Sequence, residues 1–492
     1  MLSGVINTNV NALYALNSLN NTTNTTNTLE QELSTGLSIN SPADNPAGYI
    51  AAQGFTSQLS GVNQATSNAN QAISLVQTAD GAITQQVNIL QNILSIASQA
   101  ANGGETSEQL ASLQQVVSQL QTEVSSIANQ TNFNGVSLLS GAFQNVNFQV
   151  GPSAGQTIGL SLGSTASNAV GAYQSAINAG GIYSATGVGT GGVGDNTGSS
   201  FTISAAGAFT AGNVGVSGSA GNANVAITAN ESAENFAAGV NGVTSKTNVT
   251  ATADTSVAFT VTAGTVSFTL GNGIPTAQTN STAINATISS VTASGLANLV
   301  SQINNSTGQT GIVAAVNSAN QLVLTQSQGD NITVHGFAGT GSLTAGGTTL
   351  EAAGGSTAAL IQGLTTLQST QSFGLSNTDA GLAVTSALSA LSSVNVSTQA
   401  GATAALNVVS FALQQLENVG GQLGAVQQEL QATVANLQST NTNITAAQGV
   451  VQDANIPQVT TQLTQEEILQ QAGVSALAQS STLQQAFLKL LQ

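Results

Sequence analysis

A seven-residue apolar repeat near the C-terminus constrains this chain most. The residues that recur at this interval are Leu416, Leu423, Leu430, Leu437 and Ile444. A second row of small or branched residues runs three positions later, from Val419 to Ala447. This spacing predicts a long helix with a continuous apolar stripe. The stripe needs a partner, because burying each large side chain contributes about 1.5–3 kcal/mol.

A matching stripe lies in the N-terminal part of the chain. Its strongest positions are Val76, Ile83, Val87, Leu90 and Leu94. Some forty helical residues would make a rod of roughly 60 Å. We therefore expect both ends of the chain to pack together as an antiparallel helical coiled coil, with everything between them inserted into that rod.

The rest of the chain predicts an α+β multidomain protein with a β-rich central insertion. We expect terminal helices in 1–45 and 455–492, with Pro42, Pro46, Gly36 and Gly48 marking the loop between the first two helical segments. Residues 46–165 and 360–454 should form the helical rod with one β-hairpin, and helical periodicity returns near Leu360. Residues 166–359 should form one or two β-rich domains, in which 166–250 shows no assignable pattern.

The composition excludes several classes of function. The chain has 492 residues, 19 acidic side chains and two lysines, and its net charge is −17. Two lysines can neutralise very few phosphates, so nucleic-acid binding and attraction to anionic membranes are both disfavoured. No long apolar run predicts membrane insertion, and the absence of cysteine rules out disulfides and thiolate metal sites.

Sequence motifs for catalysis are equally scarce. His335 is the only histidine, so histidine-dependent triads and zinc motifs are not expected, and a surface or loop position is the simplest interpretation. Gly187 to Gly192 matches G-x-G-x-x-G, but it lacks the flanking strand, helix and acid of a dinucleotide site. We expect no enzyme, no cofactor and no metal.

Several segments together resemble bacterial flagellin, the subunit of the flagellar filament. They include Val5–Asn9, Leu33–Ser41, Asn68–Ala82 and Gln130–Gly135 near the N-terminus, with Glu467–Gly473 and Leu477–Gln479 near the other end. A weaker resemblance to a short β-rich insert of flagellins and hook-associated proteins covers Leu296–Thr333. The resemblance spans roughly 1–165 and 360–492.

The resemblance implies a self-polymerising, extracellular subunit for swimming motility. It implies export by the flagellar secretion apparatus without a cleaved signal peptide, and partners that include an export chaperone, hook-associated proteins and a cap protein. The terminal helices would be disordered in the monomer and would pair in the filament core. The side chains expected to pack in that core are Val5, Ile6, Val10, Leu13, Ile468, Leu469, Leu477 and Leu488.

The chain departs from the flagellin pattern where basic residues are usual, near Glu32, Ser38, Ala43 and Asn92. The segment that the innate flagellin receptor reads aligns with Asn92, Ile96 and Glu123, and the arginine of that segment is lost. We therefore expect a weak receptor response. A chain this poor in cations should also avoid self-repulsion in acid, so we expect an acid-tolerant filament.

Two other functions remain open at this point. A hook–filament junction or cap protein would share the terminal helices, and a surface adhesin would act through the central domain. Filaments grown from this chain alone would favour the filament subunit.

Overall fold

The computed structural model describes residues 8–178, 182–185, 212–228, 231–274, 277–352, 358–377 and 383–490. These residues divide between two compact units. The first unit comprises Met1–Asp80, Phe143–Leu162 and Gly421–Gln492, and the second comprises Gly81–Ala142 and Gly163–Gly420. Two helices, α2 (Pro46–Ala101) and α8 (Gln399–Gln452), contribute residues to both units.

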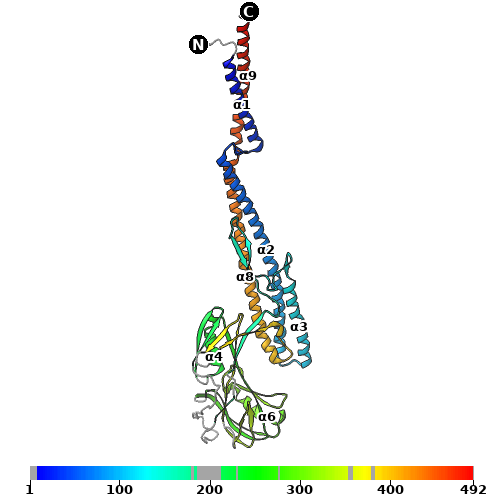
Figure 1. The fold of residues 1–492 in the computed structure, drawn as a ribbon. Coiled ribbons are helices and arrows are strands. Elements are labelled where there is room, and N and C mark those ends of the chain that lie inside the picture. The colour runs from blue at the N-terminus through cyan, green and yellow to red at the C-terminus, as the bar shows by residue number, and fades with distance from the viewer. Residues whose placement is uncertain are drawn as a thin grey trace. The chain divides into compact units, whose positions relative to one another are not determined.

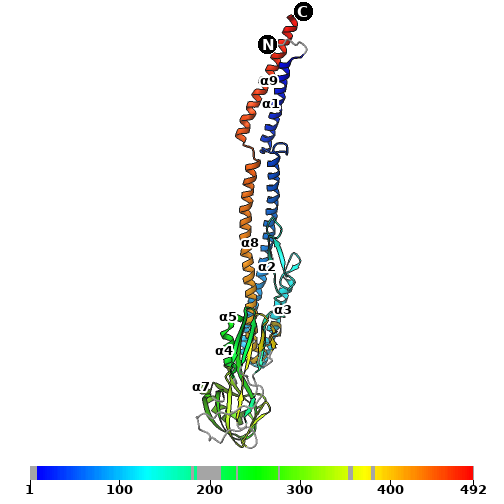
Figure 2. The same cartoon turned by 60° about the vertical axis from the view of Figure 1, so that its left-hand side comes forward.

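The first unit is built from two helix pairs. Helix α1 (Val10–Thr35) lies beside α9 (Ile456–Leu490), and the first part of α2 lies beside the last part of α8 (Figures 1 and 2). The α2–α8 pair has a small buried core in which Val62 and Ala65 pack with Leu437 and the half-buried Ile444. Asn63 accepts a hydrogen bond from Asn441 Nδ2 at 2.7 Å, and Thr56 accepts one from Gln448 Nε2 at 3.1 Å. Residue numbers rise on one helix as they fall on the other, so the expected antiparallel pairing is confirmed.

Local signals explain where these helices begin and end. Asn9 caps α1, since its Oδ1 accepts from Ala12 N at 3.0 Å, and Gly36 ends it with φ 73°. Pro46 is the first residue of α2 and Pro457 the second of α9, positions where the missing N–H of proline costs nothing. The expected loop is therefore shorter than we predicted, because Pro46 and Gly48 start a helix instead of breaking one.

The predicted β-hairpin is present in the first unit. Strands β3 (Val146–Gln149) and β4 (Thr157–Leu160) pair antiparallel, with Phe148 opposite Ile158. Asn68 on α2 donates to Gln149 O at 3.0 Å and holds the hairpin against the helix.

The second unit begins with a helical part. Helix α3 (Ser107–Gln130) starts with a capping box between Thr106 and Gln109 and is followed by the strand pair β1 (Asn132–Phe133) and β2 (Val136–Ser137). Asn134 and Gly135 have φ values of 51° and 81°, as the predicted turn requires. Buried Gln86 of α2 donates through Nε2 to Val124 O at 2.9 Å, which ties α2 to α3.

Within the described residues of this unit, three antiparallel sheets make up the β-rich part, and four short helices, α4 to α7, pack with them. A five-stranded sheet has the order β11 (Ala277–Ile288), β10 (Gly264–Ile274), β14 (Ile332–Gly339), β17 (Ala358–Ile361) and β6 (Ile182–Ala185). A second sheet runs β12 (Ile312–Val316), β13 (Leu322–Gln326), β9 (Thr250–Val261), β18 (Leu364–Ser369), β5 (Gly171–Asn178) and β21 (Ala387–Ala390), with β15 (Leu343–Ala345) and β16 (Thr348–Leu350) attached. The third runs β20 (Ala383–Thr385), β19 (Gly374–Asn377), β7 (Gly212–Gly218) and β8 (Gly221–Ile227).

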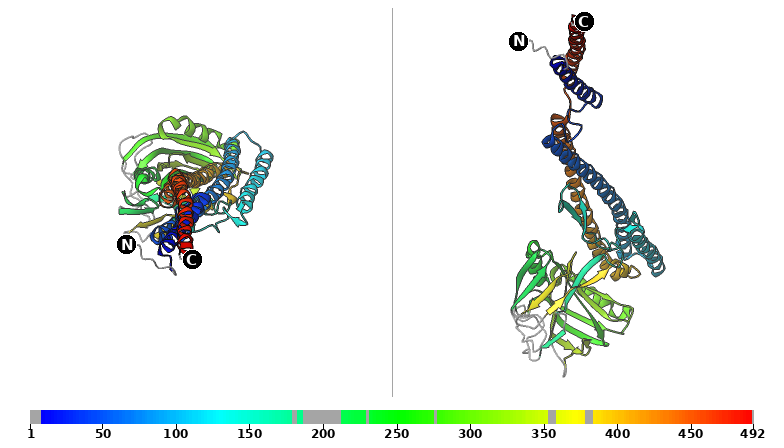
Figure 3. Two further views of the ribbon diagram at one scale, coloured as in Figure 1. Left: turned by 90° about the horizontal axis from the view of Figure 1, so that it is seen from above. Right: turned by 45° about the horizontal axis from the view of Figure 1, so that its top comes forward.

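The prediction that helix resumes near Leu360 is wrong. Residues 358–390 contain five strands, and α8 begins only at Gln399. In Figure 3 the yellow strands after residue 358 lie among the green strands of the central region. Leu364 and Leu367 have helix-like spacing, but β5 and β9 flank their strand on both sides and pairing with them decides its conformation.

Candidate self-association surface

The α1–α9 pair joins the two ends of the chain. Near one end of the pair, Asn9 Nδ2 donates to Ser480 Oγ at 3.2 Å, and further along Gln470 Nε2 donates to Thr23 Oγ1 at 3.3 Å. Between these bonds, Gly473 faces Leu19, whose Cδ1 would lie 3.5 Å from a Cβ at the glycine. At this distance a Cβ would make an ordinary van der Waals contact with Leu19.

Pairing does not cover the large apolar side chains of these two helices. Leu13 is 55% exposed, Tyr14 is 70% exposed and Ile468 is 61% exposed. Val10 and Leu469 are exposed as well, and Leu477 is half-buried. These exposed side chains of α1 and α9 form what we call the terminal apolar face. Exposed apolar side chains of this kind are candidates for an association surface.

The connections between the two helix pairs are tied to each other. Leu37 forms a β-bridge with Asp453, Ser38 N donates to Gln452 O at 2.7 Å, and Ala454 N donates to Gly36 O at 2.9 Å. Ser38 Oγ also donates to Gln452 O, at 3.2 Å. Hydrogen bonds therefore hold this joint at a position where the flagellin resemblance leads one to expect a basic side chain.

The pKa values of two carboxyl groups at the joint are shifted in opposite directions. Burial, with a smaller contribution from the charge of Asp44, raises the pKa of Glu32 above its usual value. The pKa of Asp44 is lowered, because its carboxylate accepts backbone N–H bonds from Ser41 at 2.7 Å and Asn40 at 2.9 Å.

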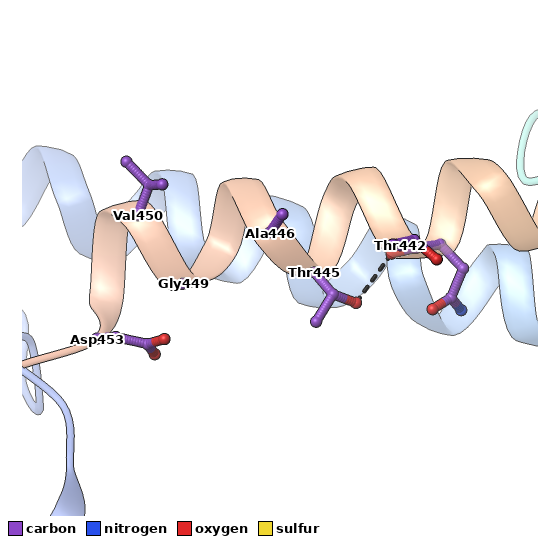
Figure 4. A pocket seen from close by; sticks show the side chains of 7 residues that line it. Thr442, Thr445, Ala446, Gly449, Val450 and Asp453 are labelled. Carbon is purple, nitrogen blue, oxygen red and sulfur yellow. Dashed lines mark hydrogen bonds between the residues drawn. The ribbon is translucent and has the colours of Figure 1, made fainter.

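A shallow, open hollow of about 720 Å³ lies on the outer side of α8 (Figure 4). Its lining residues are Asn441, Thr442, Thr445, Ala446, Gly449, Val450 and Asp453. Val450 is 88% exposed, and Ile50 of α2, in the same unit, is 72% exposed. Sequence reasoning missed both. For Val450, the sequence signal was its position next to Val451. A single apolar stripe on a helix cannot bury two adjacent residues, so one of the two valines should be exposed.

The predicted seam residues differ in burial. Val76, Ile83, Leu90, Leu416, Leu423, Leu430 and Leu437 are buried, while Val87, Leu94 and Ile444 are half-buried. Of the expected filament-core residues, Val5 and Ile6 lie outside the described residues, as does the side chain of Leu488. Gly187–Gly192 also lies outside them.

The remaining candidates lie in the second unit. Asn92 and Glu123 are exposed and Ile96 is half-buried. His335 is in β14, not in a loop as predicted, and burial lowers the pKa of its imidazole. Among the described residues, no three potential ligand side chains are grouped to hold a metal, and no helix is long and apolar enough to cross a bilayer.

Comparison with known proteins agrees with this architecture. Residues 6–144 match the bacterial flagellin N-terminal helical region and residues 406–491 match the C-terminal helical region. A B-type flagellin of Pseudomonas aeruginosa is 33% identical over 514 residues, which cover 99% of each chain. The chain belongs to the bacterial flagellin family. Flagellin B of Helicobacter pylori is 31% identical over 527 residues, again with 99% of each chain covered.

Solved structures show more distant likenesses. FliC from Burkholderia pseudomallei is 21% identical with a TM-score of 0.31, covering 73% of this chain and 99% of that one. The flagellar junction protein FlgL from Legionella pneumophila is 13% identical with a TM-score of 0.33, covering 82% and 100%. As a flagellin, the chain is a structural subunit that polymerises into the extracellular flagellar filament and serves swimming motility.

Proposed function

We propose that the terminal apolar face and the hollow beside Val450 make the contacts between copies of this flagellin in the filament. The exposure of Leu13 and Ile468 after α1 and α9 have paired supports this proposal most directly. Helices α1 and α9 contact each other through the residues that face each other within one chain. Their exposed apolar side chains would then be left to contact neighbouring copies. By sequence, Val5, Ile6 and Leu488 extend that second set.

The two surfaces differ from each other, so the contact between copies would be heterologous. A repeated heterologous contact that does not close into a ring produces an open helical polymer. The tract Asn20–Thr26 has weak helix propensity, so α1 should be marginal without a partner. Ordering of the terminal helices would then accompany assembly and make growth depend on an existing filament end.

The change Ile468→Gln tests this proposal. It keeps a good helix former and removes a side chain whose burial is worth about 1.5–3 kcal/mol. The critical concentration for seeded polymerisation should rise by about tenfold or more, while the melting temperature of the monomer stays unchanged. Gln471→Ala, at an exposed polar position of the same helix, is the matched control. An unaltered critical concentration for the Ile468 variant would remove α9 from the interface.

The proposal extends to the functional division of the chain. Residues 1–45 and 455–492 would form the filament core, 46–165 and 399–454 the surrounding rod, and the β-rich region between them, which extends to residue 390, the solvent-facing surface. Export through the flagellar secretion apparatus, with a chaperone for the terminal helices and hook-associated and cap proteins at the filament ends, follows from the same assignment. Electron microscopy of filaments seeded from this chain alone, with and without the two terminal segments, distinguishes a filament subunit from a junction protein.

The receptor-facing segment is a separate proposal. Asn92 is exposed on α2 and carries no charge, so an acidic receptor surface would gain no ion pair from it. We expect the innate flagellin receptor to respond weakly to the purified monomer, and Asn92→Arg to strengthen the response in a receptor reporter assay. A full response to the unmodified monomer would contradict this.

A further inference from the structure

The β-rich region contains two helix-to-strand connections with the same hydrogen bonds, one from α4 to β9 and one from α6 to β12. In the first, Asn241 reaches Ala251 through two bonds: its Nδ2 donates to Ala251 O at 2.9 Å and its Oδ1 accepts from Ala251 N at 2.8 Å. In the second, Asn304 makes the same pair of bonds to Ala314, at 3.0 and 2.7 Å. Each asparagine side chain thus pairs with the backbone of the strand that follows its helix, through one donated and one accepted hydrogen bond.

The threonines next to these asparagines match as well. Thr244 Oγ1 donates to Val249 O at 2.8 Å, and Thr307 Oγ1 donates to Ile312 O at 2.7 Å. Thr247 and Thr310 each donate to a carbonyl four residues earlier at 3.1 Å and accept from a backbone N–H two residues later at 3.3 Å. A left-handed residue, Asn248 or Gly311, follows each. Each residue of the second connection lies 63 positions after its equivalent in the first, as Asn304 does after Asn241.

The surrounding elements follow the same order. Hairpin β7–β8 leads to α4 (Ala233–Gly242), α5 (Thr244–Thr247) and β9, and hairpin β10–β11 leads to α6 (Ala293–Asn305), α7 (Thr307–Thr310) and β12. Strand β9 pairs with β18, and β12 pairs with β13. The next strand then returns to the hairpin, β19 to β7 and β14 to β10.

Buried positions coincide between the two sets. Each set has its own hydrophobic core, and matched residues are buried in both. The matched pairs are Val214 with Phe268, Val216 with Leu270, Phe236 with Leu299, Val240 with Ile303, Leu367 with Leu324, and Leu375 with Val334. The side chains differ in size, but the strand register and the helix face agree.

We propose that the β-rich region of this flagellin contains two copies of one module, with the second copy inserted into the first. The outer copy consists of β7, β8, α4, α5, β9, β18 and β19. The inner copy, from β10 to β14, lies between β9 and β18 in the chain. The insertion point in the outer copy is the connection that follows β9 and would otherwise lead directly to β18.

The same turn in the inner copy is Asn317–Gln321, between β12 and β13. It closes with Asn317 N donating to Gln321 O at 3.1 Å, and its tip is exposed. If the module tolerates a folded insert here, this turn is a site at which a further domain can be carried on the filament surface.

Segment exchange in the full-length chain tests the duplication. Residues 241–251 are replaced by the sequence of residues 304–314, which places Asn, both Thr and Ala in register. The melting temperature of the β-rich region should change by less than about 5 °C, the scale of a change near 1 kcal/mol. The matched control inserts residues 303–313 instead, one position out of register, and should abolish the folding transition of the outer module.

Equal behaviour of the two exchanges overturns the proposal, whether both fold or both unfold. The insertion point is tested in the same chain by placing a compact domain between Ala319 and Asn320. That variant should polymerise from seeds like the unmodified chain, while the same domain placed between Thr310 and Gly311, inside the hydrogen-bonded junction, should not leave a folded module. Loss of the fold in the first insertion overturns the assignment of this turn.

Discussion

At the scale of single residues, glutamine side chains of α3 hold the segment between β21 and α8. Gln121 of α3 donates through Nε2 to Leu391 O at 2.7 Å and to Val394 O at 3.1 Å, and it is buried. Gln114, two turns earlier, accepts from Val396 N. These side chains satisfy backbone groups at the point where the last strand gives way to α8.

Replacement of Gln121 by Leu should therefore lower the stability of the second unit. The new side chain is of similar size but removes two hydrogen bonds to backbone carbonyls, each worth about 0.5–1.5 kcal/mol. Thermal unfolding followed by circular dichroism should show a lower midpoint. Gln119→Leu, at an exposed position of the same helix, should leave the midpoint in place. A neutral Gln121 variant would mean that water replaces the lost donor.

At the scale of elements, the α8 seam and the outer face of the same helix have separate roles. Leu423 is fully buried and Val450 is almost fully exposed. Leu423→Ala should destabilise the chain by about 2–5 kcal/mol, because it leaves a cavity in a packed seam. Val450→Ala should leave the free energy of unfolding unchanged. Urea denaturation of both variants measures the difference, and comparable losses would contradict the assignment of Val450 to an outer surface.

At the scale of the whole molecule, a net charge of −17 with few cations makes stability depend on pH. Burial raises the pKa of Glu234, Asp254 and Asp330, and the Glu234–Asp330 repulsion adds to the shift of Glu234. A carboxyl group whose pKa is raised by folding binds protons more tightly in the folded state. Stability therefore increases as pH falls through the folded pKa, until the unfolded chain is protonated too.

We expect the melting temperature of the monomer to rise as pH is lowered from 7 toward 4.5. Asp44 and Glu108 act in the opposite direction, since folding lowers their pKa values. Their contribution to stability is lost only when the pH falls below the ordinary pKa values of 3.8 for Asp44 and 4.5 for Glu108. Glu234→Gln should raise stability at pH 7 and reduce the pH dependence. Glu123→Gln, an exposed change of equal charge, is its control. A monomer that loses stability steadily from pH 7 downward would contradict both expectations.

The helical ends were predictable because their information is periodic and local. The seam from Leu416 to Ile444 and the hairpin at Val146–Leu160 each follow from residue spacing within one segment. The strands at Phe259, Phe268 and Leu322 follow from alternation in the same way. The weaker family resemblance covered only the inner β module, since Leu296–Thr333 carries its apolar pattern more strongly than the outer copy does.

By itself, the sequence determined that the two chain ends are helical, complementary and self-associating, because a stripe of apolar side chains cannot remain in water. Only the tertiary structure decided which side chains stay exposed after the pairing, since Val450 and Val451 are alike in sequence but Val450 is exposed and Val451 is half-buried. It also decided strands β18, β19 and β21, each of which pairs with a strand more than a hundred residues earlier. Contacts between distant segments outweigh local propensity there, and no reading of neighbouring residues contains them.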